Sequence, residues 1–420
     1  MAKIKKIVGR QVFDSRGNPT VEAEVFLKNN IKATAIVPSG ASTGAFEAYE
    51  LRDNNKNYFF GKSVLDAVRN INTILNKNLK NIDAGQQKKI DKILVDLDGT
   101  ENKEKFGANA LLAVSLAIAK AGAISKKKEL YQHLGKKIIL PKPLMNIING
   151  GAHADNNLKI QEFMIRPDSA NNFMDAIEKC FLVIQNLKKI LQSKNLSTNV
   201  GDEGGFAPLI NSNEEALELI VDAIEKSKLK PGKDVNICLD VAANELINNT
   251  GKYSLNSSDF ISVDESINYY KNLVTKYPIK SIEDPFAEND WSAWSKLTKE
   301  IGKNVQIVGD DLFVTNVKRL KKGVKEKSAN SILIKVNQIG TLTETLNVIE
   351  LAKKNNFSTI ISHRSGDTED TFIADLAVAT GSNQIKTGSL ARSERVAKYN
   401  RLLRIEEQLG KSSKIARIKS

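Results

Sequence analysis

Three short apolar runs of the sequence each end on an acidic residue: Asp240, Glu283 and Asp310. If the runs are neighbouring strands, the three carboxylates converge and repel one another unless a hard cation neutralises them. No Cys or His stands at a comparable position, and a ligand set of oxygens alone favours Mg²⁺ over zinc. The alternative is that each acid pairs with a nearby Lys or Arg. The spacing predicts a magnesium site.

Two lysines, Lys335 and Lys386, end later apolar runs in the same way. Such a lysine can be a surface residue that extends its charge into solvent. Beside a second cation and a metal, however, its pKa should fall towards values useful for proton abstraction. After a further run, Arg364 and Ser365 combine a guanidinium fork with a hydroxyl, which suits a phosphate group.

Two glycine-rich stretches complete the candidate chemistry. Residues 39–44 (SGASTG) have few bulky side chains and predict a mobile lid or a phosphate-side loop. They lack the spacing of a P-loop. Residues 201–205 (GDEGG) place Glu203 on a turn, where an acid could donate a proton. Taken singly, either stretch is also compatible with an ordinary loop.

The elements that must position these residues fall into two parts. Residues 4–13, 20–27 and 32–37 read as an antiparallel strand meander. A helical period begins near residue 64, and residues 108–123 are apolar nearly all round, which predicts a helix buried on several sides. We place the first domain at 1–135 and the second, a catalytic barrel, at 136–420.

The second part begins with a predicted hairpin, 144–148 and 159–165, followed by helices at 172–192 and 214–227. Ser212 and Glu215 form a predicted capping box at the start of the second helix. Six short apolar runs then alternate with helical segments, which implies parallel strands; the runs are 235–239, 279–282, 305–308, 331–334, 358–361 and 384–385. Functional groups at successive strand ends favour a closed (β/α) barrel over an open doubly wound sheet.

The composition is that of a soluble globular protein, 41% hydrophobic and 26% charged. No signal peptide and no apolar run near the roughly 18 residues of a membrane span is evident, so we expect a cytoplasmic protein. Cys180 and Cys238 read as core residues. The net charge of +13 comes from short, scattered basic runs, which are typical of solvated faces.

The motifs, taken together, resemble the enolase family from about Ile4 to Gly410. No catalytic position departs from the family pattern, although the basic charge is unusual for it. Eight motifs occur in family order: 14–22 (DSRGNPTVE), 37–44 (VPSGASTG), 150–156 (GGAHADN), 161–165 (QEFMI), 200–206 (VGDEGGF), 331–345 (SILIKVNQIGTLTET), 361–366 (ISHRSG) and 385–388 (IKTG).

The resemblance implies an α/β fold: an N-terminal α+β domain followed by a β2α2(βα)6 barrel. It implies a lyase that dehydrates 2-phosphoglycerate to phosphoenolpyruvate through a Mg²⁺-stabilised enolate, with two Mg²⁺ per site. The family sites of this kind combine a Lys base with Mg²⁺. The implied roles are Asp240, Glu283 and Asp310 for the first Mg²⁺, Ser42 for the second, Lys335 as base, Glu203 with Glu162 as acid, Arg364 and Ser365 for phosphate, Lys386 for carboxylate, and His153 and Gln161 near the leaving hydroxyl.

Two other readings stay open from the sequence. A different barrel lyase or racemase of the wider superfamily would use the metal triad on another acid, but the phosphate-binding residues argue against it. An RNA-associated or cell-surface binding protein would use the basic faces, in addition to the enzyme activity rather than instead of it. We also expect a homodimer or an octamer of dimers, and we consider a secondary surface or secreted fraction.

Overall fold

The N-terminal part of the chain is built on a three-stranded antiparallel sheet. In the computed structural model, which describes residues 2–40, 44–256 and 259–418, the strands are β1 (Ile4–Phe13), β2 (Pro19–Leu27) and β3 (Lys32–Ile36). They pair in the order β1-β2-β3, so the predicted meander is confirmed. Val21, Ala23, Val25 and Leu27, which share one face of β2, are buried in the core.

Helix α4 (Ala108–Ser125) packs on β2 and β3 and is buried on nearly every side, as its apolar sequence predicts. By length and composition it could cross a membrane, but 83% of it lies inside the protein, as in the core helix of a globular domain. The other helices of this part are η1 (Phe59–Gly61), α1 (Leu65–Asn70), the π-helical η2 (Ile71–Leu75), α2 (Asn76–Leu79), α3 (Gln87–Asp98) and α5 (Leu130–Leu134).

The C-terminal part is a closed eight-stranded barrel, which confirms the predicted β2α2(βα)6 order. The first two strands pair antiparallel, as does the second with the third, and all other pairs are parallel. The strands are β4 (Lys142–Asn149), β5 (Glu162–Arg166), β6 (Asn236–Asp240), β7 (Ile279–Glu283), β8 (Gln306–Gly309), β9 (Ser331–Ile334), β10 (Ser358–Ser362) and β11 (Gln384–Lys386).

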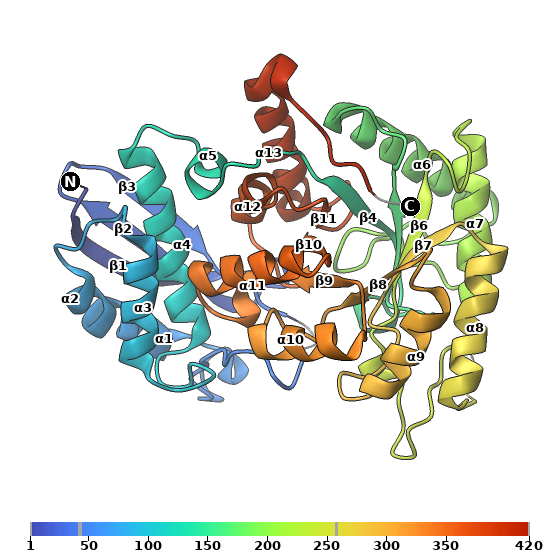
Figure 1. The fold of residues 1–420 in the computed structure, drawn as a ribbon, viewed down its shortest axis with the longest axis horizontal. Helices are drawn as coiled ribbons and strands as arrows, with labels where there is room; N and C mark the ends of the chain where they lie inside the picture. Colours follow the sequence, from blue (N-terminus) through green and yellow to red (C-terminus); the bar gives the residue numbers. More distant parts are fainter. Residues whose placement is uncertain (1, 41–43, 257–258, 419–420) are drawn as a thin grey trace.

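Helices surround the barrel, and Figure 1 shows the three-stranded sheet at one end of the molecule with α11 and α12 between it and the barrel. Buried side chains of β4, β5, β6, β8, β9 and β10, Cys238 among them, form a small apolar cluster of their own. The helices are α6 (Phe173–Ser193), α7 (Asn213–Lys226), α8 (Val263–Lys276), α9 (Trp291–Ile301), α10 (Val317–Glu326), α11 (Leu342–Lys354), α12 (Phe372–Thr380) and α13 (Ser393–Leu409), with short 3-10 turns η3 (Gly151–His153), η4 (Ala243–Glu245), η5 (Val336–Gln338) and η6 (Gly410–Ser412).

The predicted capping box at the start of α7 is half right. The Ser212 side chain accepts the Glu215 backbone N–H, as expected of an N-cap. The Glu215 carboxylate, however, accepts the backbone N–H of Asn211 at 2.9 Å, one residue before the expected partner. The Glu215 side chain therefore still accepts a backbone N–H before the first turn of α7, but from Asn211 rather than from Ser212.

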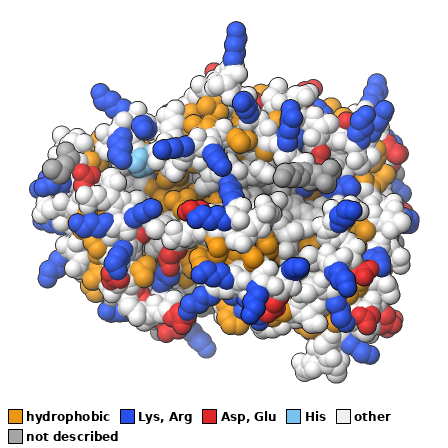
Figure 2. Space-filling view, viewed as in Figure 1, with side chains coloured by type: hydrophobic (Ala, Val, Ile, Leu, Met, Phe, Trp, Pro, Cys, Tyr) orange, Lys and Arg blue, Asp and Glu red, His pale blue; other side chains and the backbone are white. Residues whose placement is uncertain are grey.

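The basic side chains on the face in Figure 2 are spread over it and interleaved with acidic ones. This distribution agrees with solvated faces rather than a single basic stripe on the visible side.

Candidate active site

Strand geometry brings the three predicted metal ligands to one end of the barrel. Asp240 and Glu283 are paired in register at the ends of β6 and β7, and Asp310 follows β8 directly. All three are buried. Lys386, at the end of β11, donates to Asp240 Oδ2 at 2.9 Å and to Glu283 Oε1 at 2.8 Å. In this structure a lysine therefore supplies the counter-charge for two of the acids, as the alternative reading required.

Excess negative charge nevertheless remains at the barrel mouth. Burial, then Asp240, raises the pKa of Glu283 well above its ordinary value, although Lys386 opposes the shift. Among the residues that the structure describes, Glu283 Oε2 is buried and finds no hydrogen-bond partner. A buried carboxylate oxygen without a partner, beside a second carboxylate, fits a divalent cation bound by oxygen ligands.

The acidic residues whose potential ligand atoms lie closest together are not Asp240, Glu283 and Asp310 as a set. Among the described residues, two sets of three place potential ligand atoms within 4.8 Å of one another, and only Asp310 of the triad belongs to either. The sets are His153 with Glu162 and Glu203, and Asp284 with Asp310 and Asp311.

Lys335 follows β9 and forms an ion pair with Asp310 Oδ2. Burial alone would lower the pKa of Lys335, but Asp310 outweighs it, and the net pKa is raised. The sequence-based expectation of a lowered pKa was made for a lysine beside a metal and a second cation, and it did not include the carboxylate partner Asp310. Lys386 behaves likewise: burial opposes its charge, whereas Asp240 and Glu162 raise its pKa well above normal.

The predicted acid lies opposite these lysines in a buried cluster. Glu203 Oε1 is 3.3 Å from His363 Nε2 and 3.7 Å from His153 Nδ1, and Asn146 donates to Glu203 Oε2 at 3.2 Å. Burial raises the pKa of Glu203, yet contact with the two histidines produces a net downward shift. Burial, then Glu203, raises the pKa of Glu162 well above normal. The two glutamates thus favour one shared proton, held on Glu162.

His363 is a buried member of this cluster for which the sequence predicted no role. Burial lowers the pKa of His363 to about 4, so its ring is neutral near pH 7. Arg395 lies 2.6 Å from His363 Nδ1. A guanidinium can only donate, so Nδ1 accepts and the ring proton is on Nε2, facing Glu203.

Arg364, predicted to bind phosphate, is paired with a carboxylate instead. Its two terminal nitrogens donate to Glu47 at 2.9 and 3.1 Å. A bidentate carboxylate satisfies the same fork geometry as a phosphate. Glu47 belongs to the N-terminal part of the chain, more than 300 residues away, so no local pattern could have identified it.

The cavity at this mouth is small, about 30 Å³. Ser42 lies outside the described residues. All other predicted site residues except Glu283 line the cavity: His153, Gln161, Glu162, Glu203, Asp240, Asp310, Lys335, Arg364, Ser365 and Lys386.

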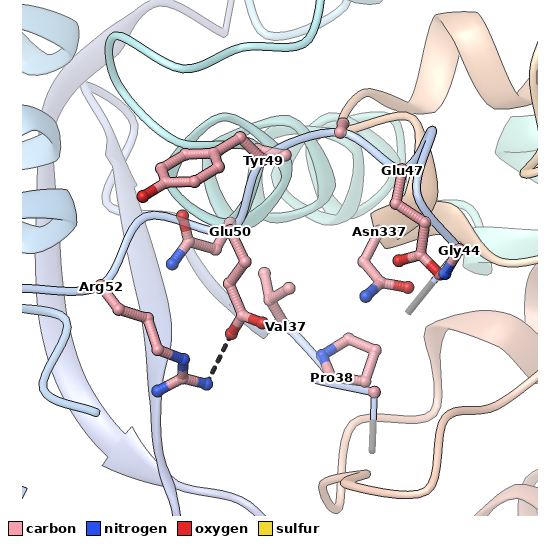
Figure 3. A pocket seen from close by; sticks show the side chains of 12 residues that line it. Val37, Pro38, Gly44, Glu47, Tyr49, Glu50, Arg52 and Asn337 are labelled. Carbon is pink, nitrogen blue, oxygen red and sulfur yellow. Dashed lines mark hydrogen bonds and ion pairs between the residues drawn. The ribbon is translucent and has the colours of Figure 1, made fainter. Parts of the chain in front are cut away.

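A larger pocket of about 310 Å³ opens beside Glu47. Figure 3 shows it between the segment of Val37 and Pro38, the ion pair of Glu50 with Arg52, and Asn337 from the barrel. The Glu50–Arg52 distance is 2.7 Å, and Arg52 also donates to Ser39 Oγ at 3.2 Å. These contacts hold the segments on both sides of residues 41–43.

Asp284 is a second buried residue of the site for which the sequence predicted no role. Its two oxygens accept the backbone N–H groups of Asp310 and Asp311, each at 2.9 Å. Burial, then Asp311, raises its pKa well above normal. Asp284 directly follows Glu283 in the sequence. Two adjacent acidic residues do not show, however, which of them accepts hydrogen bonds from the backbone of a neighbouring loop.

Comparisons with known proteins agree along the whole chain. Residues 4–134 match the family described as "Enolase, N-terminal domain", and residues 137–420 match "Enolase, C-terminal TIM barrel domain". A curated relative named "Enolase", from Pelagibacter ubique (strain HTCC1062), is 63% identical over 420 residues, covering 100% of both chains.

Proposed function

The chain belongs to the enolase family, and we propose which of its residues perform the family's reaction. It is a glycolytic carbon–oxygen lyase that dehydrates 2-phosphoglycerate to phosphoenolpyruvate. The observation that carries the proposal is the convergence of Lys335, Lys386 and the Glu203 cluster on one cavity at the barrel mouth.

Lys335 removes the proton next to the substrate carboxylate. That proton is weakly acidic because its removal places a second negative charge on the carboxyl oxygens. Lys386 stabilises this charge with its own, and its burial strengthens the interaction because water does not screen it.

Glu203 completes the elimination by protonating the departing hydroxyl. The proton held on Glu162, whose pKa is raised by burial and by Glu203, would pass to Glu203 for this step, and His153 and Gln161 line the same cavity. Arg364 and Ser365 hold the phosphate, for which Glu47 must leave the Arg364 guanidinium.

Asp240, Glu283 and Asp310 would hold one Mg²⁺, and Ser42 would contribute to a second. When bound, Mg²⁺ supplies positive charge to the substrate's carboxyl and phosphate oxygens. The buried Glu283 oxygen without a partner supports the first position.

We propose further that the protein works in the cytoplasm as a homodimer and that its domains meet at residues 135 and 136. Sedimentation velocity would separate the dimer from an octamer. Salt-sensitive, Mg²⁺-independent retention of RNA would support an added binding role.

The test is a coupled absorbance assay for phosphoenolpyruvate formed from 2-phosphoglycerate. Chelation should abolish turnover, and Mg²⁺ should restore it. The matched variants Asp310→Asn and Asp264→Asn change one acid each, the second on the exposed surface of α8. Only the first should raise the Mg²⁺ concentration needed for activity. Full turnover in exhaustively chelated buffer would end the metal assignment.

A further inference from the structure

A buried glutamine beside the predicted metal ligands connects three parts of the site. Gln338 closes the short turn η5 after β9 and is 1% exposed. Its Nε2 donates to Asp310 Oδ1 at 2.9 Å, and its Oε1 accepts from Thr315 Oγ1 at 2.8 Å. Asp310 thus has Gln338 on one oxygen and Lys335 on the other.

Thr315 determines which way the Gln338 amide points. The Thr315 hydroxyl oxygen accepts the backbone N–H of Lys335 at 3.0 Å and donates its single proton to Gln338. A proton donor on that side requires the amide oxygen there, so the NH₂ group must face Asp310. The Lys335 backbone N–H, by donating to Thr315, leaves the Thr315 hydroxyl proton for Gln338 and so sets the orientation of the Gln338 amide.

The backbone around Thr315 is strained in a way that supports a site role. Val314 and Thr315 have φ of 42° and 51°. Both are β-branched, and such residues rarely adopt positive φ. Strain of this kind persists only where the surroundings impose it, and it concentrates at functional sites. The strained turn delivers the Thr315 hydroxyl to Gln338 and Lys335.

Gln338 also contacts the segment that contains Glu47, the residue paired with Arg364. The backbone carbonyl oxygen of Gln338 accepts the Ala48 backbone N–H at 2.9 Å. The side-chain Nε2 of Gln338 donates to Glu47 Oε1 at 3.3 Å. The same side chain therefore touches a predicted metal ligand and the carboxylate on Arg364.

We propose that Gln338, oriented by Thr315, is a positioning residue that fixes the rotation of the Asp310 carboxylate and so sets the affinity for Mg²⁺. The inference rests on the proposed assignment of Asp310 as a metal ligand. A carboxylate held on one oxygen presents the other at a fixed angle, and such outer partners typically change metal affinity about 10–100-fold.

The experiment measures Mg²⁺ binding to metal-free protein by titration calorimetry, together with the melting temperature. Gln338→Met keeps the volume and removes the side-chain hydrogen bonds to Asp310, Thr315 and Glu47, and Thr315→Val removes only the hydroxyl that orients the amide. The control is Gln384→Met. Gln384 is equally buried, accepts from Arg166 at 2.9 Å, and lies at the opposite end of the barrel.

Gln338→Met should raise the Mg²⁺ dissociation constant about 10-fold or more. Thr315→Val should raise it less, and Thr315→Ser should restore it. Gln384→Met should lower the melting temperature and leave Mg²⁺ affinity unchanged. If Gln338→Met fails to fold, the Thr315 pair decides the outcome.

Two results would overturn the inference, and Asp310→Asn distinguishes them. If Asp310→Asn weakens Mg²⁺ binding but Gln338→Met and Thr315→Val do not, the positioning role is wrong and the metal assignment stands. If Asp310→Asn itself binds Mg²⁺ normally, the proposed ligand set is wrong, and the positioning role falls with it.

Discussion

Lys335 and Lys386 each carry a positive charge into a group of buried carboxylates, and their ion pairs offset part of the acids' mutual repulsion. An unpaired buried charge costs several kcal/mol, so each acid needs a partner. Lys386 contacts Asp240 and Glu283, and Lys335 contacts Asp310. A cation bound by the same oxygens would compete with both lysines. A bound cation would therefore weaken the ion pair that holds Lys335 on Asp310.

The roles proposed for Lys335 as base and Glu203 as acid can be separated by isotope exchange. Lys335→Ala should stop exchange of the substrate α-proton with deuterated water and also stop elimination. Glu203→Gln should block elimination while some exchange continues, because proton removal precedes loss of hydroxide. Each loss should be about 10²–10⁴-fold, the usual contribution of a positioned acid or base. Nuclear magnetic resonance of the substrate measures both rates.

Circular dichroism should show both variants folded, since each residue lies at a strand end or on a turn. Normal exchange in Lys335→Ala would remove Lys335 as the base. Loss of exchange in Glu203→Gln alone would reverse the two assignments.

Lys353, which does not line the active-site cavity, allows the effect of burial on a lysine pKa to be measured. Burial, and then Lys137, lowers its pKa to about 8, and its ammonium donates to the carbonyl of Thr380 at the end of α12. Competitive acetylation followed by mass spectrometry should give a labelling midpoint near pH 8 for Lys353. Lys137→Gln should move that midpoint upward. A midpoint near the ordinary lysine value of about 10.4 would contradict the burial argument.

At the scale of elements, the sequence predicted the strands better than the contacts between them. The barrel strands are apolar runs that end on polar residues, and this pattern is local, so β6 to β11 were found within one or two residues. Helix α3 was missed, although Asp91 and Leu94 lie on its buried side. The partners Glu47, Thr315 and Gln338 depend on tertiary packing, which neither periodicity nor motif spacing encodes.

The segment carrying Glu47 should act as an internal competitor for phosphate. Glu47→Gln removes the charge from the pair with Arg364 while keeping the side chain's size. We expect the variant to bind inorganic phosphate more tightly than wild type, by a few-fold, because Arg364 then lacks its anionic partner. Calorimetric titration of metal-free protein gives the affinity directly. Glu50→Gln is the control, since Glu50 pairs with Arg52, whereas Glu47 pairs with Arg364.

Weaker phosphate binding in Glu47→Gln than in Glu50→Gln would mean that Glu47 supports the anion site rather than occupying it. Tighter binding in both variants would indicate a general charge effect.

At the scale of the whole molecule, buried polar contacts join the N-terminal helices to the barrel. Lys120 pairs with Asp370 at 2.6 Å, and Lys103 pairs with Glu344 at 3.0 Å. Asp91 on α3 accepts from the backbone N–H of Thr343 at 2.9 Å and from Ser115 Oγ at 2.7 Å. The N-terminal part thus caps the start of α11, the helix that follows the Lys335 turn.

Asp91 gives the sharpest test of this junction. Burial raises its pKa, although its hydrogen bonds with Thr343 and Ser115 oppose the shift. Asp91→Asn places an NH₂ group among donors and should lower the free energy of unfolding by about 1–3 kcal/mol. Asp96→Asn, on the exposed side of the same helix, should change it by less than about 0.5 kcal/mol.

The pH dependence of that deficit follows from linkage. Folded Asp91 binds its proton more tightly than the unfolded chain does, so wild-type stability gains from this residue as pH falls through the folded pKa towards the unfolded value. Asparagine cannot titrate, and the deficit of Asp91→Asn relative to wild type should grow towards acid pH. Urea unfolding at several pH values measures the difference. A deficit that shrinks on acidification would mean that Asp91 is held ionised by its donors, with a lowered rather than a raised pKa.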